Sequence, residues 1–366
     1  MNQNVNVIAY YLPQFHPIKE NNEWWGPGFT EWTNVAKAKP LFRTHYQPKI
    51  PADLGFYDLR NVETRESQAA LAKEAGVQGF CYWHYWFGNG KRLLERPFND
   101  VLKSGTPDFP FCLGWANESW KAKVWGDVGG KKDKLLIEQL YPGSEDNENH
   151  FYSLLDAFRD DRYIKINGKP FFLIYKPFQF NEMEKFIVQW NKLAKEVGLS
   201  DGMHFVAQVD NANQKIVLEG YGFNAFVYTP RLLASYQRRS KLIRFFSKIK
   251  RTLLRTPLII DYADAVNGFV DKDEDGVENV MPTILPNWDH SPRSGTKAVV
   301  LHNSTPDFFR INVRAAIDAV ANKSEVNKII MLKSWNEWGE GNYMEPDLKF
   351  STDYLKALKQ ELEIYK

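Results

Sequence analysis

Eight short apolar runs alternate with eight helical patterns, and this alternation constrains the fold more than any other feature. The apolar runs have the length of buried strands and lie at 5–12, 77–83, 109–115, 171–176, 204–209, 224–229, 280–285 and 328–335. The helical patterns, with apolar residues at helical spacing, lie at 62–75, 91–104, 145–159, 181–197, 213–219, 236–253, 307–322 and 352–364. Such alternation predicts parallel βα units and an α/β fold, a (β/α)8 TIM barrel with long βα loops. No internal repeat or low-complexity segment interrupts it, so we expect residues 1–366 to form a single barrel domain.

The loops that follow the predicted strands are rich in Trp, His and carboxylates. The loop after the first strand contains WWGPGFTEWTNV (24–35), and the loop after the eighth begins with SWNEWGEG (334–341). Ordinary loops favour Gly, Ser and Asp rather than Trp. Aromatic residues make up 15% of the chain and include 12 Trp, which suggests stacking surfaces as well as core packing. Because a barrel places its active site on the loops after its strands, we expect the site there.

Bulk properties exclude several classes of function. The net charge is +2, so no overall field favours nucleic acid. Cys81 and Cys112 both sit in apolar runs and are expected to be buried thiols. No spacing typical of zinc ligands, no nucleophile elbow and no phosphate-binding loop is present, so we expect neither a metal nor a cofactor. DKDEDGVE (271–278) resembles the start of a calcium loop, but its twelfth position is Pro282, which predicts a polar turn.

Two features bear on where the protein acts. The first residues, MNQNVNVIAYYLPQ, have no basic region and no long apolar region, and no run reaches transmembrane length. We therefore expect a cytoplasmic protein. The segment 236–255 is strongly basic, with apolar residues along one face. It is either an outer barrel helix with a solvated basic face or an interfacial helix that contacts anionic lipid at the inner face of a membrane.

Five carboxylates are candidates for chemistry: Glu31, Glu118, Asp289, Glu337 and Glu340. Glycosidic bond cleavage uses two carboxyl groups, and Trp and Tyr offer flat faces to sugar rings. Two assignments remain open at this point. Glu118 and Glu337, on different strands, would suit a double displacement. Alternatively, Glu337 and Glu340 act from one loop on adjacent atoms, one removing a proton from a substrate hydroxyl and the other protonating the leaving group.

The same blocks resemble a known family. They are similar to the WbsX-type proteins associated with bacterial polysaccharide and O-antigen gene clusters, and more distantly to glycoside hydrolase family 99, the endo-α-mannosidase and endo-α-mannanase family. The resemblance covers roughly 5–350, and the blocks that carry it are AYYLPQFHP (9–17), WWGPGFTEWTNV (24–35), GFCYWHYWF (79–87), WANESW (115–120), PNWDHSPR (286–293) and SWNEWGEG (334–341).

The resemblance implies a retaining barrel enzyme that acts on glycans without a metal, through a 1,2-anhydro sugar. By analogy Glu337 would deprotonate the substrate's 2-hydroxyl, and Glu340 would be the general acid and then the base. Gly339 and Gly341 would let the loop turn tightly. The substrate would be an oligosaccharide or lipid-linked glycan of a bacterial surface polysaccharide. The expected lining residues, three of which (Tyr11, Trp83 and Trp115) fit the core equally well, are Tyr11, His16, Trp32, Trp83, His84, Trp115, Asn117, Glu118, Trp288, Asp289, Arg293, Trp335, Asn336 and Trp338.

Three alternatives remain. The first is a glycosyltransferase with an activated sugar donor, although no DxD motif occupies a suitable loop. The second is a non-catalytic carbohydrate-binding barrel, which would have no need of both glutamates. The third is the double displacement by Glu118 and Glu337. The sequence predicts neither the sugar, nor hydrolysis over transfer, nor the oligomeric state.

Overall fold

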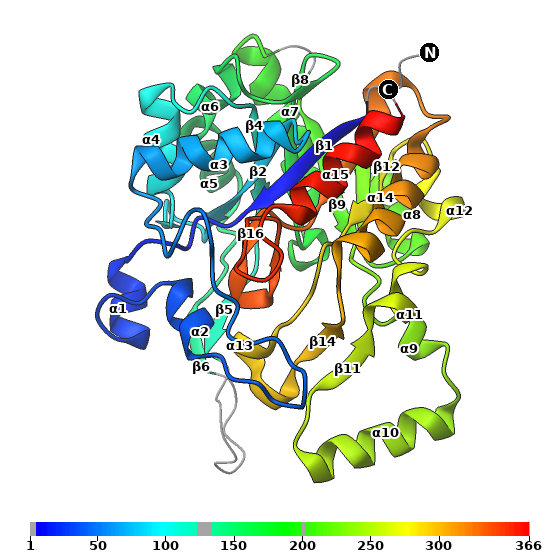
Figure 1. Ribbon diagram of the computed structural model, residues 1–366. Helices are drawn as coiled ribbons and strands as arrows, with labels where there is room; N and C mark the ends of the chain where they lie inside the picture. Colours follow the sequence, from blue (N-terminus) through cyan, green and yellow to red (C-terminus); the bar gives the residue numbers. More distant parts are fainter. Residues whose placement is uncertain (1–4, 123–133, 200–201, 366) are drawn as a thin grey trace. The chain divides into compact units, whose positions relative to one another are not determined.

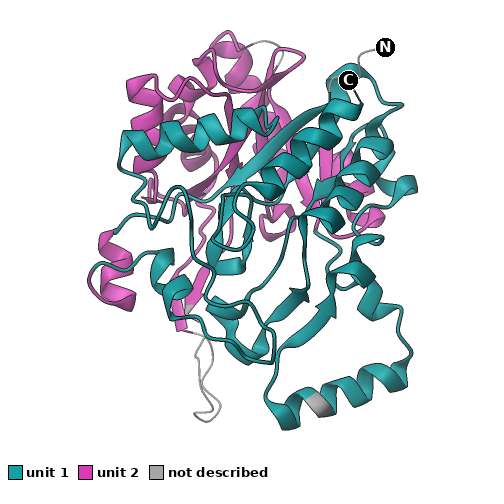
Figure 2. Ribbon diagram, viewed as in Figure 1, with its two compact units in different colours: residues 1–17, 28–78, 230–366 teal, residues 18–27, 79–229 magenta. Residues whose placement is uncertain are grey.

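The computed structural model describes residues 5–122, 134–199 and 202–365, without the side chain of Lys250. Part of the loop expected after the third strand, 123–133, lies outside the described residues. The chain divides into two compact units (Figure 2). Unit 1 comprises Met1–Pro17, Gly28–Gln78 and Pro230–Lys366, and unit 2 comprises Ile18–Pro27 and Gly79–Thr229. The organisation as a single domain stays a prediction.

Parallel strands form the centre of unit 1 (Figure 1). Asn6 of the first strand pairs with Ile329, and Met331 pairs with Thr283, so three strands run parallel in one sheet. These strands are buried on both faces, which explains why they read as continuous apolar runs rather than alternating ones. The strands of unit 1 are β1 (Asn6–Tyr11), β11 (Leu258–Asp261), β12 (Val280–Met281), β13 (Thr283–Ile284), β14 (Val299–His302), β15 (Ile329–Leu332), β16 (Asn336–Glu337) and β17 (Asn342–Tyr343).

The helices of unit 1 include three long ones at the predicted positions. The buried carboxylate of Glu361 pairs with Arg310 and Arg314, which joins the last two of them. The helices are α2 (Glu31–Lys37), α3 (Val62–Glu74), α9 (Ala234–Gln237), α10 (Lys241–Leu254), α11 (Tyr262–Val266), α12 (Lys272–Asp275), α13 (Ser291–Ser294), α14 (Pro306–Val320) and α15 (Asp353–Ile364), with 3-10 turns η2 (Gly295–Lys297), η3 (Glu325–Asn327) and η4 (Trp338–Glu340).

Unit 2 is built on five parallel strands in the order β2-β4-β8-β9-β10. Cys81 and Cys112 face each other on β2 and β4 and are free and buried, which confirms the expected core thiols. The strands are β2 (Gly79–Trp86), β3 (Arg92–Leu93), β4 (Phe111–Trp115), β5 (Trp120–Ala122), β6 (Lys134–Ile137), β7 (Lys165–Ile166), β8 (Lys169–Ile174), β9 (His204–Val209) and β10 (Ala225–Tyr228). The helices are α1 (Lys19–Trp25), α4 (Arg96–Ser104), α5 (Ser144–Ser153), α6 (Leu155–Arg159), η1 (Pro177–Gln179), α7 (Met183–Glu196) and α8 (Ala212–Gly220).

Some predicted elements differ from the structure in their boundaries. The strand expected at 280–285 is split at Pro282, which has no N–H for a strand ladder. The helix expected at 91–104 begins only at Arg96, because 92–93 pair with β2 as a short antiparallel strand. The polar turn expected at 271–278 was wrong: the segment contains helix α12, capped by the Asp271 carboxylate. The parallel pair β11 and β14 was not predicted.

Candidate active site

The loop that follows β15 is anchored to the end of β1. The backbone N–H of Trp335 donates to Tyr10 O at 2.8 Å. The side chain of Asn336 accepts from the N–H of Leu12 at 2.7 Å and donates to its carbonyl at 3.0 Å, like a paired strand residue. β16 and β17 then close an antiparallel hairpin, with η4 at its turn. Glu337 and Glu340 are therefore held at fixed positions in a braced turn.

The two glycines of this turn are needed for close approach. A Cβ on Gly339 would collide with the carboxylate of Glu31 and would touch the guanidinium of Arg293. Gly341 has φ of +55°, and a Cβ there would lie 2.7 Å from both Asp289 Cβ and Lys49 Nζ. Gly339 thus lets a charged cluster pack against the backbone, while Gly341 supplies the left-handed conformation that ends the turn.

Three carboxylates and two cations surround the turn. Arg293 donates to Glu31 at 2.8 Å and to Glu340 at 2.6 Å, so its guanidinium bridges the two acids. Lys333 Nζ lies 3.6 Å from the carboxylate of Glu337. Glu337 is buried, whereas the side chain of Glu340 keeps 17% of its surface exposed. The two cations therefore neutralise part of the negative charge of the three carboxylates, and the cluster is open to solvent at Glu340.

The surroundings of the turn raise the pKa values of Glu337 and Arg293. Burial raises the pKa of Glu337, and the nearby Glu340, which also hydrogen-bonds to it, raises it further, while Lys333 and Arg293 oppose this. Burial alone would lower the pKa of Arg293, but the charges of Glu31 and Glu340 outweigh it and raise that pKa. Glu337 consequently keeps a proton more readily than an exposed glutamate does, and Arg293 remains a cation beside Glu340.

Asp289 anchors the turn and does not act as a proton donor. Its carboxylate is buried and accepts hydrogen bonds from His45 at 2.8 Å and Gln47 at 2.5 Å, and its backbone N–H donates to Glu340 O at 2.8 Å. Burial would raise the pKa of Asp289, but the hydrogen bond from His45 and the charge of Lys49 outweigh it, so the pKa falls well below its usual range. Asp289 is thus an ionised support for the Glu340 backbone.

Glu345 stabilises the turn through a hydrogen bond with Trp338. Its buried carboxylate accepts from Trp338 Nε1 at 2.6 Å, from the Tyr57 hydroxyl at 2.9 Å and from Gln68 Nε2 at 2.6 Å. Burial raises the pKa of Glu345 to about 7, although these hydrogen bonds act in the opposite direction. The indole of Trp338 is fixed by this bond and by stacking on Tyr343, whose ring centroid is 3.7 Å away.

Besides Asp289, six of the expected lining residues in unit 1 are buried. Trp335 and Trp338 have no exposed surface, so they support the turn instead of forming a wall against a sugar. The indole of Trp32 donates to Tyr57 O at 2.8 Å. The six are Tyr11, His16, Trp32, Trp335, Asn336 and Trp338.

Trp288 is the expected aromatic residue that keeps a partly open face beside the acids. It is half-buried, stacks on His290 and lies with its ring 5.8 Å from Lys333 Nζ. His290 Nε2 is in turn 3.7 Å from the Glu340 carboxylate. Trp288 therefore lies among the groups that contact Glu337 and Glu340.

The other expected residues belong to unit 2. Trp83, His84 and Trp115 are buried, and His84 Nε2 lies 2.8 Å from His150 Nε2. Burial lowers the pKa of His84 well below its usual range, so it remains neutral. Asn117 bonds to both the N–H and the carbonyl of Lys176, at 2.7 and 2.9 Å. Glu118 is half-buried, and its pairing with Glu337 across a substrate stays a prediction.

Several residues of the cluster were not predicted as site residues: His45, Lys49, Lys333 and Glu345. Glu31 was predicted as a candidate acid, although not as a lining residue, and Lys333, four residues before Glu337, offered a weak signal. His45 and Lys49 lie in a segment without helix or strand. The sequence of such a segment has no periodic pattern of apolar residues that would predict which residues these side chains contact.

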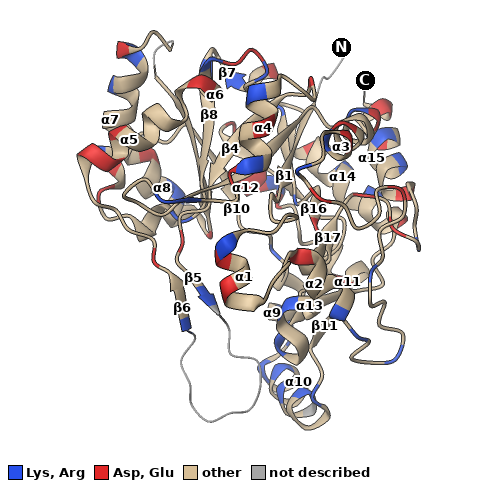
Figure 3. Cartoon of the chain, turned by 90° about the vertical axis from the view of Figure 1, so that its left-hand side faces the viewer, with Lys and Arg blue, Asp and Glu red and all other residues tan. Residues whose placement is uncertain are grey.

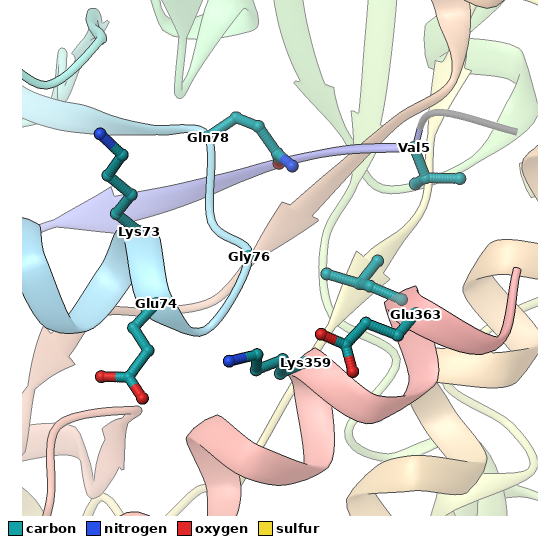
Figure 4. A pocket seen from close by; sticks show the side chains of 8 residues that line it. Val5, Lys73, Glu74, Gly76, Gln78, Lys359 and Glu363 are labelled. Carbon is teal, nitrogen blue, oxygen red and sulfur yellow. The ribbon is translucent and has the colours of Figure 1, made fainter. Parts of the chain in front are cut away.

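A pocket of about 290 Å³ in unit 1 lies away from this cluster (Figure 4). Val5, at its wall, precedes the amino end of β1, whereas the acids follow the carboxyl end of β15. Charges of both signs line it, from Lys73, Glu74, Lys359 and Glu363. The amino-terminal end of a barrel usually serves stability, and no chemistry is assigned to this pocket.

Within the described ranges, no group of three or more His, Cys, Asp and Glu side chains is placed to hold a metal ion. Searching the same part of the chain for a helix both long and apolar enough to cross a membrane also finds none.

Comparisons with known proteins agree along nearly the whole chain. A family model described as Glycosyltransferase WbsX matches residues 7–358. The protein WxcX of Xanthomonas campestris pv. campestris strain B100, described as uncharacterized, is 33% identical over 370 residues, which cover 97% of this chain and 49% of WxcX. WxcX of strain ATCC 33913 gives the same values. The chain therefore spans about half the length of the curated relatives it matches.

Solved structures show the same fold at low sequence identity. A glycoside hydrolase-like protein has a TM-score of 0.62 at 16% identity and covers 99% of this chain and 94% of its own. The GH99 endo-alpha-mannosidase from Bacteroides thetaiotaomicron, in complex with bis-tris propane, has a TM-score of 0.60 at 14% identity and covers 98% and 97%. This likeness confirms the predicted (β/α)8 barrel.

Proposed function

The chain belongs to the WbsX glycosyltransferase family, and we propose that it is a retaining carbohydrate-active enzyme, a hydrolase or transglycosidase, in which Glu337 and Glu340 act together. The observation that carries this proposal is the placement of both acids in one braced turn, where Glu340 raises the pKa of the buried Glu337, Arg293 bonds to Glu340 and Lys333 lies 3.6 Å from Glu337. We propose a glycan of a bacterial surface polysaccharide, free or lipid-linked, as the substrate.

The spacing of the pair favours adjacent substrate atoms over opposite faces of one ring. A nucleophile and an acid for double displacement stand about 5 Å apart on either side of the anomeric carbon. Two acids three residues apart in one turn instead suit the 2-hydroxyl and the glycosidic oxygen, which are attached to neighbouring carbons. This assignment makes Glu118 unnecessary for bond cleavage.

The proposed reaction has two steps. Glu337 removes the proton of the 2-hydroxyl while that oxygen attacks the anomeric carbon, and Glu340 protonates the departing oxygen, which leaves a 1,2-anhydro sugar. Glu340 then deprotonates water or an acceptor hydroxyl, whose oxygen opens the three-membered ring at the anomeric carbon, and Glu337 returns the proton to the sugar's second oxygen. Two inversions give overall retention.

The proton of the pair has to move before the first step. In the structure Arg293 pairs with Glu340 while burial favours the proton on Glu337. The proposed roles need that proton on Glu340. A 2-hydroxyl that donates to Glu337 would favour the ionised form of that acid and drive transfer of the proton to the nearby Glu340.

The family's description as a glycosyltransferase supports a second candidate, transfer from an activated sugar donor. A panel assay separates the two candidates. Wild type, Glu337→Gln and Glu340→Gln are incubated with α-linked oligosaccharides, manno-oligosaccharides first, and with lipid-linked glycans, each with and without nucleotide sugars. Glu118→Gln is the matched control. We expect turnover without nucleotide sugar, a loss of about 10³-fold or more in both variants of the pair, and near-normal turnover in the control.

Turnover that requires a nucleotide sugar and survives both substitutions would overturn the paired-glutamate mechanism in favour of the transferase. Loss of activity in Glu118→Gln, with its fold intact, would instead favour the double displacement by Glu118 and Glu337.

A further inference from the structure

Helix α10 exposes a continuous apolar stripe. Leu242, Phe246, Ile249 and Leu253 follow one another at intervals of four, three and four residues, so they lie on one line along the helix. Their exposed fractions are 70%, 64%, 40% and 77%. The neighbouring Ile243, Phe245 and Leu254 widen the stripe and are also more than half exposed.

Four of the five basic residues of α10 occupy the opposite line, and the fifth, Lys250, comes seven residues after Ile243. Lys241, Arg244, Lys248 and Arg251 recur at intervals of three, four and three residues. Arg244 and Arg251 are half-buried, so the charged line is better covered than the apolar one. An outer helix of a barrel would show the reverse, with its apolar stripe against the core. The structure therefore does not bear out the interpretation of 236–255 as a packed outer helix with a solvated basic face.

The helix is a defined element. The hydroxyl of Ser240 caps its first turn by accepting from the N–H of Ile243 at 3.3 Å, and Arg255 ends it in a left-handed conformation. Figure 1 shows α10 at the bottom of the view, set off from the other helices and strands of unit 1. The stripe is thus presented by a capped helix.

All the charged residues of segment 236–255 are basic. Residues 236–255 include eight Lys and Arg and no Asp or Glu. Figure 3 shows the corresponding blue segments on α10. A second copy of the same helix would bring like charges together, and an ordinary apolar groove would leave these cations without counter-charges. An anionic bilayer supplies phosphates for the cations and acyl chains for the apolar side chains.

We propose that α10 is an interfacial helix that binds the surface of an anionic lipid bilayer. Phe246 and its neighbours on the apolar stripe enter the boundary between headgroups and acyl chains, and the helix lies parallel to the membrane plane. Lys241 and Lys248, at one edge of the stripe, extend their ammonium groups to lipid phosphates. This contact would place the enzyme where lipid-linked glycans are found. The inference does not depend on the roles of Glu337 and Glu340.

Vesicle co-sedimentation tests the proposal. The chain is mixed with vesicles of phosphatidylcholine alone or with about one third phosphatidylglycerol, at low salt and at about 0.5 M salt. We expect binding to the anionic vesicles, at least about tenfold weaker binding to neutral ones, and weakening by salt. Leu253→Glu should reduce binding to anionic vesicles at least about tenfold, because a carboxylate would enter the apolar stripe and repel the phosphates.

Leu348→Glu is the matched control, since Leu348 is an exposed leucine of the same unit, 67% exposed, outside α10. It should bind like wild type. Circular dichroism and a thermal melt check that both variants fold, and Lys241→Glu with Lys248→Glu provides a second test that leaves the apolar stripe intact.

Three outcomes would overturn the proposal. One is that the folded wild type does not bind anionic vesicles at low salt. Another is that Leu253→Glu binds as tightly as Leu348→Glu. The third is that sedimentation velocity detects a dimer lost only in Leu253→Glu, without vesicle binding, which would make the stripe an interface between copies. None of these readouts depends on glycan turnover, so failure here is distinguishable from failure of the glutamate mechanism.

Discussion

Gly339 is the residue of the turn at 338–341 where an added side chain would have the least space. Any side chain there would displace Glu31 or Arg293, and these are the groups that hold Glu340 in place. The motif SWNEWGEG therefore specifies its glycines as strictly as its acids. The sequence could show that the turn is tight, but only the structure shows which charged groups occupy the space.

Gly339→Ala should lower turnover about 100-fold or more and reduce stability by about 1–3 kcal/mol, because the added methyl group has to push a buried carboxylate away. Gly220→Ala is the control, since a Cβ there meets nothing within 4 Å at the end of α8. Stability is measured by chemical denaturation and activity on the glycan panel. Wild-type turnover in Gly339→Ala would show that the Glu31–Arg293–Glu340 cluster is not required.

Glu345 makes the stability of the protein depend on pH. Its pKa of about 7 lies above that of an exposed glutamate, so between these two values the folded protein holds a proton that the unfolded chain has released. Stability should therefore fall as pH rises from about 4.5 to about 7, by at most about 3 kcal/mol from this group.

Glu345→Gln should remove this contribution. Melting temperatures of wild type and variant are compared from pH about 5 to about 8. The advantage of wild type over the variant should shrink as pH rises, because only wild type has to bury a charge. A difference that stays constant, or grows with pH, would contradict the raised pKa of Glu345.

The side chains that could not be predicted share one property: they meet the loop from distant sequence. Glu31, His45 and Gln47 reach the Glu340 region from segments more than two hundred residues away.

Burial also decides which role the residues of a motif can have. The tryptophans of SWNEWGEG suggested sugar stacking, yet their rings are fully enclosed, and the half-exposed Trp288 is better placed for that role.

At the scale of elements, the sequence predicted the long helices and buried strands closely, because each has a clear period or a continuous apolar run. β9 matches its predicted range of 204–209, and α3 ends one residue before its predicted end at 75. The short elements were missed, among them α12. Four residues of helix cannot establish a period, and α12 is held by tertiary contacts: Asp275 pairs with Arg231 at 2.7 Å, and Lys323 bonds to its carbonyl at 2.6 Å.

These contacts predict that the acidic segment 271–278 is structural. Asp275→Ala should destabilise the protein by about 3 kcal/mol, because it leaves Arg231 without its buried partner. Asp273→Ala, at an exposed position of the same helix, should change stability by less than about 0.5 kcal/mol. Thermal unfolding with and without calcium measures both. A calcium-dependent rise in melting temperature that Asp273→Ala abolishes would show that the segment binds calcium after all.

At the scale of the whole molecule, alternation of strand and helix was sufficient to predict the barrel. Eight apolar runs, each followed by a helical pattern, leave few other architectures, and solved glycoside hydrolase structures share this fold over nearly the full chain. The division into two compact units was not predicted, since unit 1 combines three separate chain segments and no linker marks its boundaries. The alternation of strands and helices also cannot predict the substrate, because the loops that select a sugar have no periodic pattern of residues.

The stereochemistry of the first product tests the central claim most directly. Proton NMR follows the anomeric signals during turnover of the α-linked substrate that the panel identifies, before mutarotation mixes the anomers. Paired action of Glu337 and Glu340 through a 1,2-anhydro sugar predicts that wild type releases the α-anomer first and that Glu337→Gln and Glu340→Gln release neither. Initial release of the β-anomer would mean a single inversion by water, and the account of the paired glutamates would then be wrong.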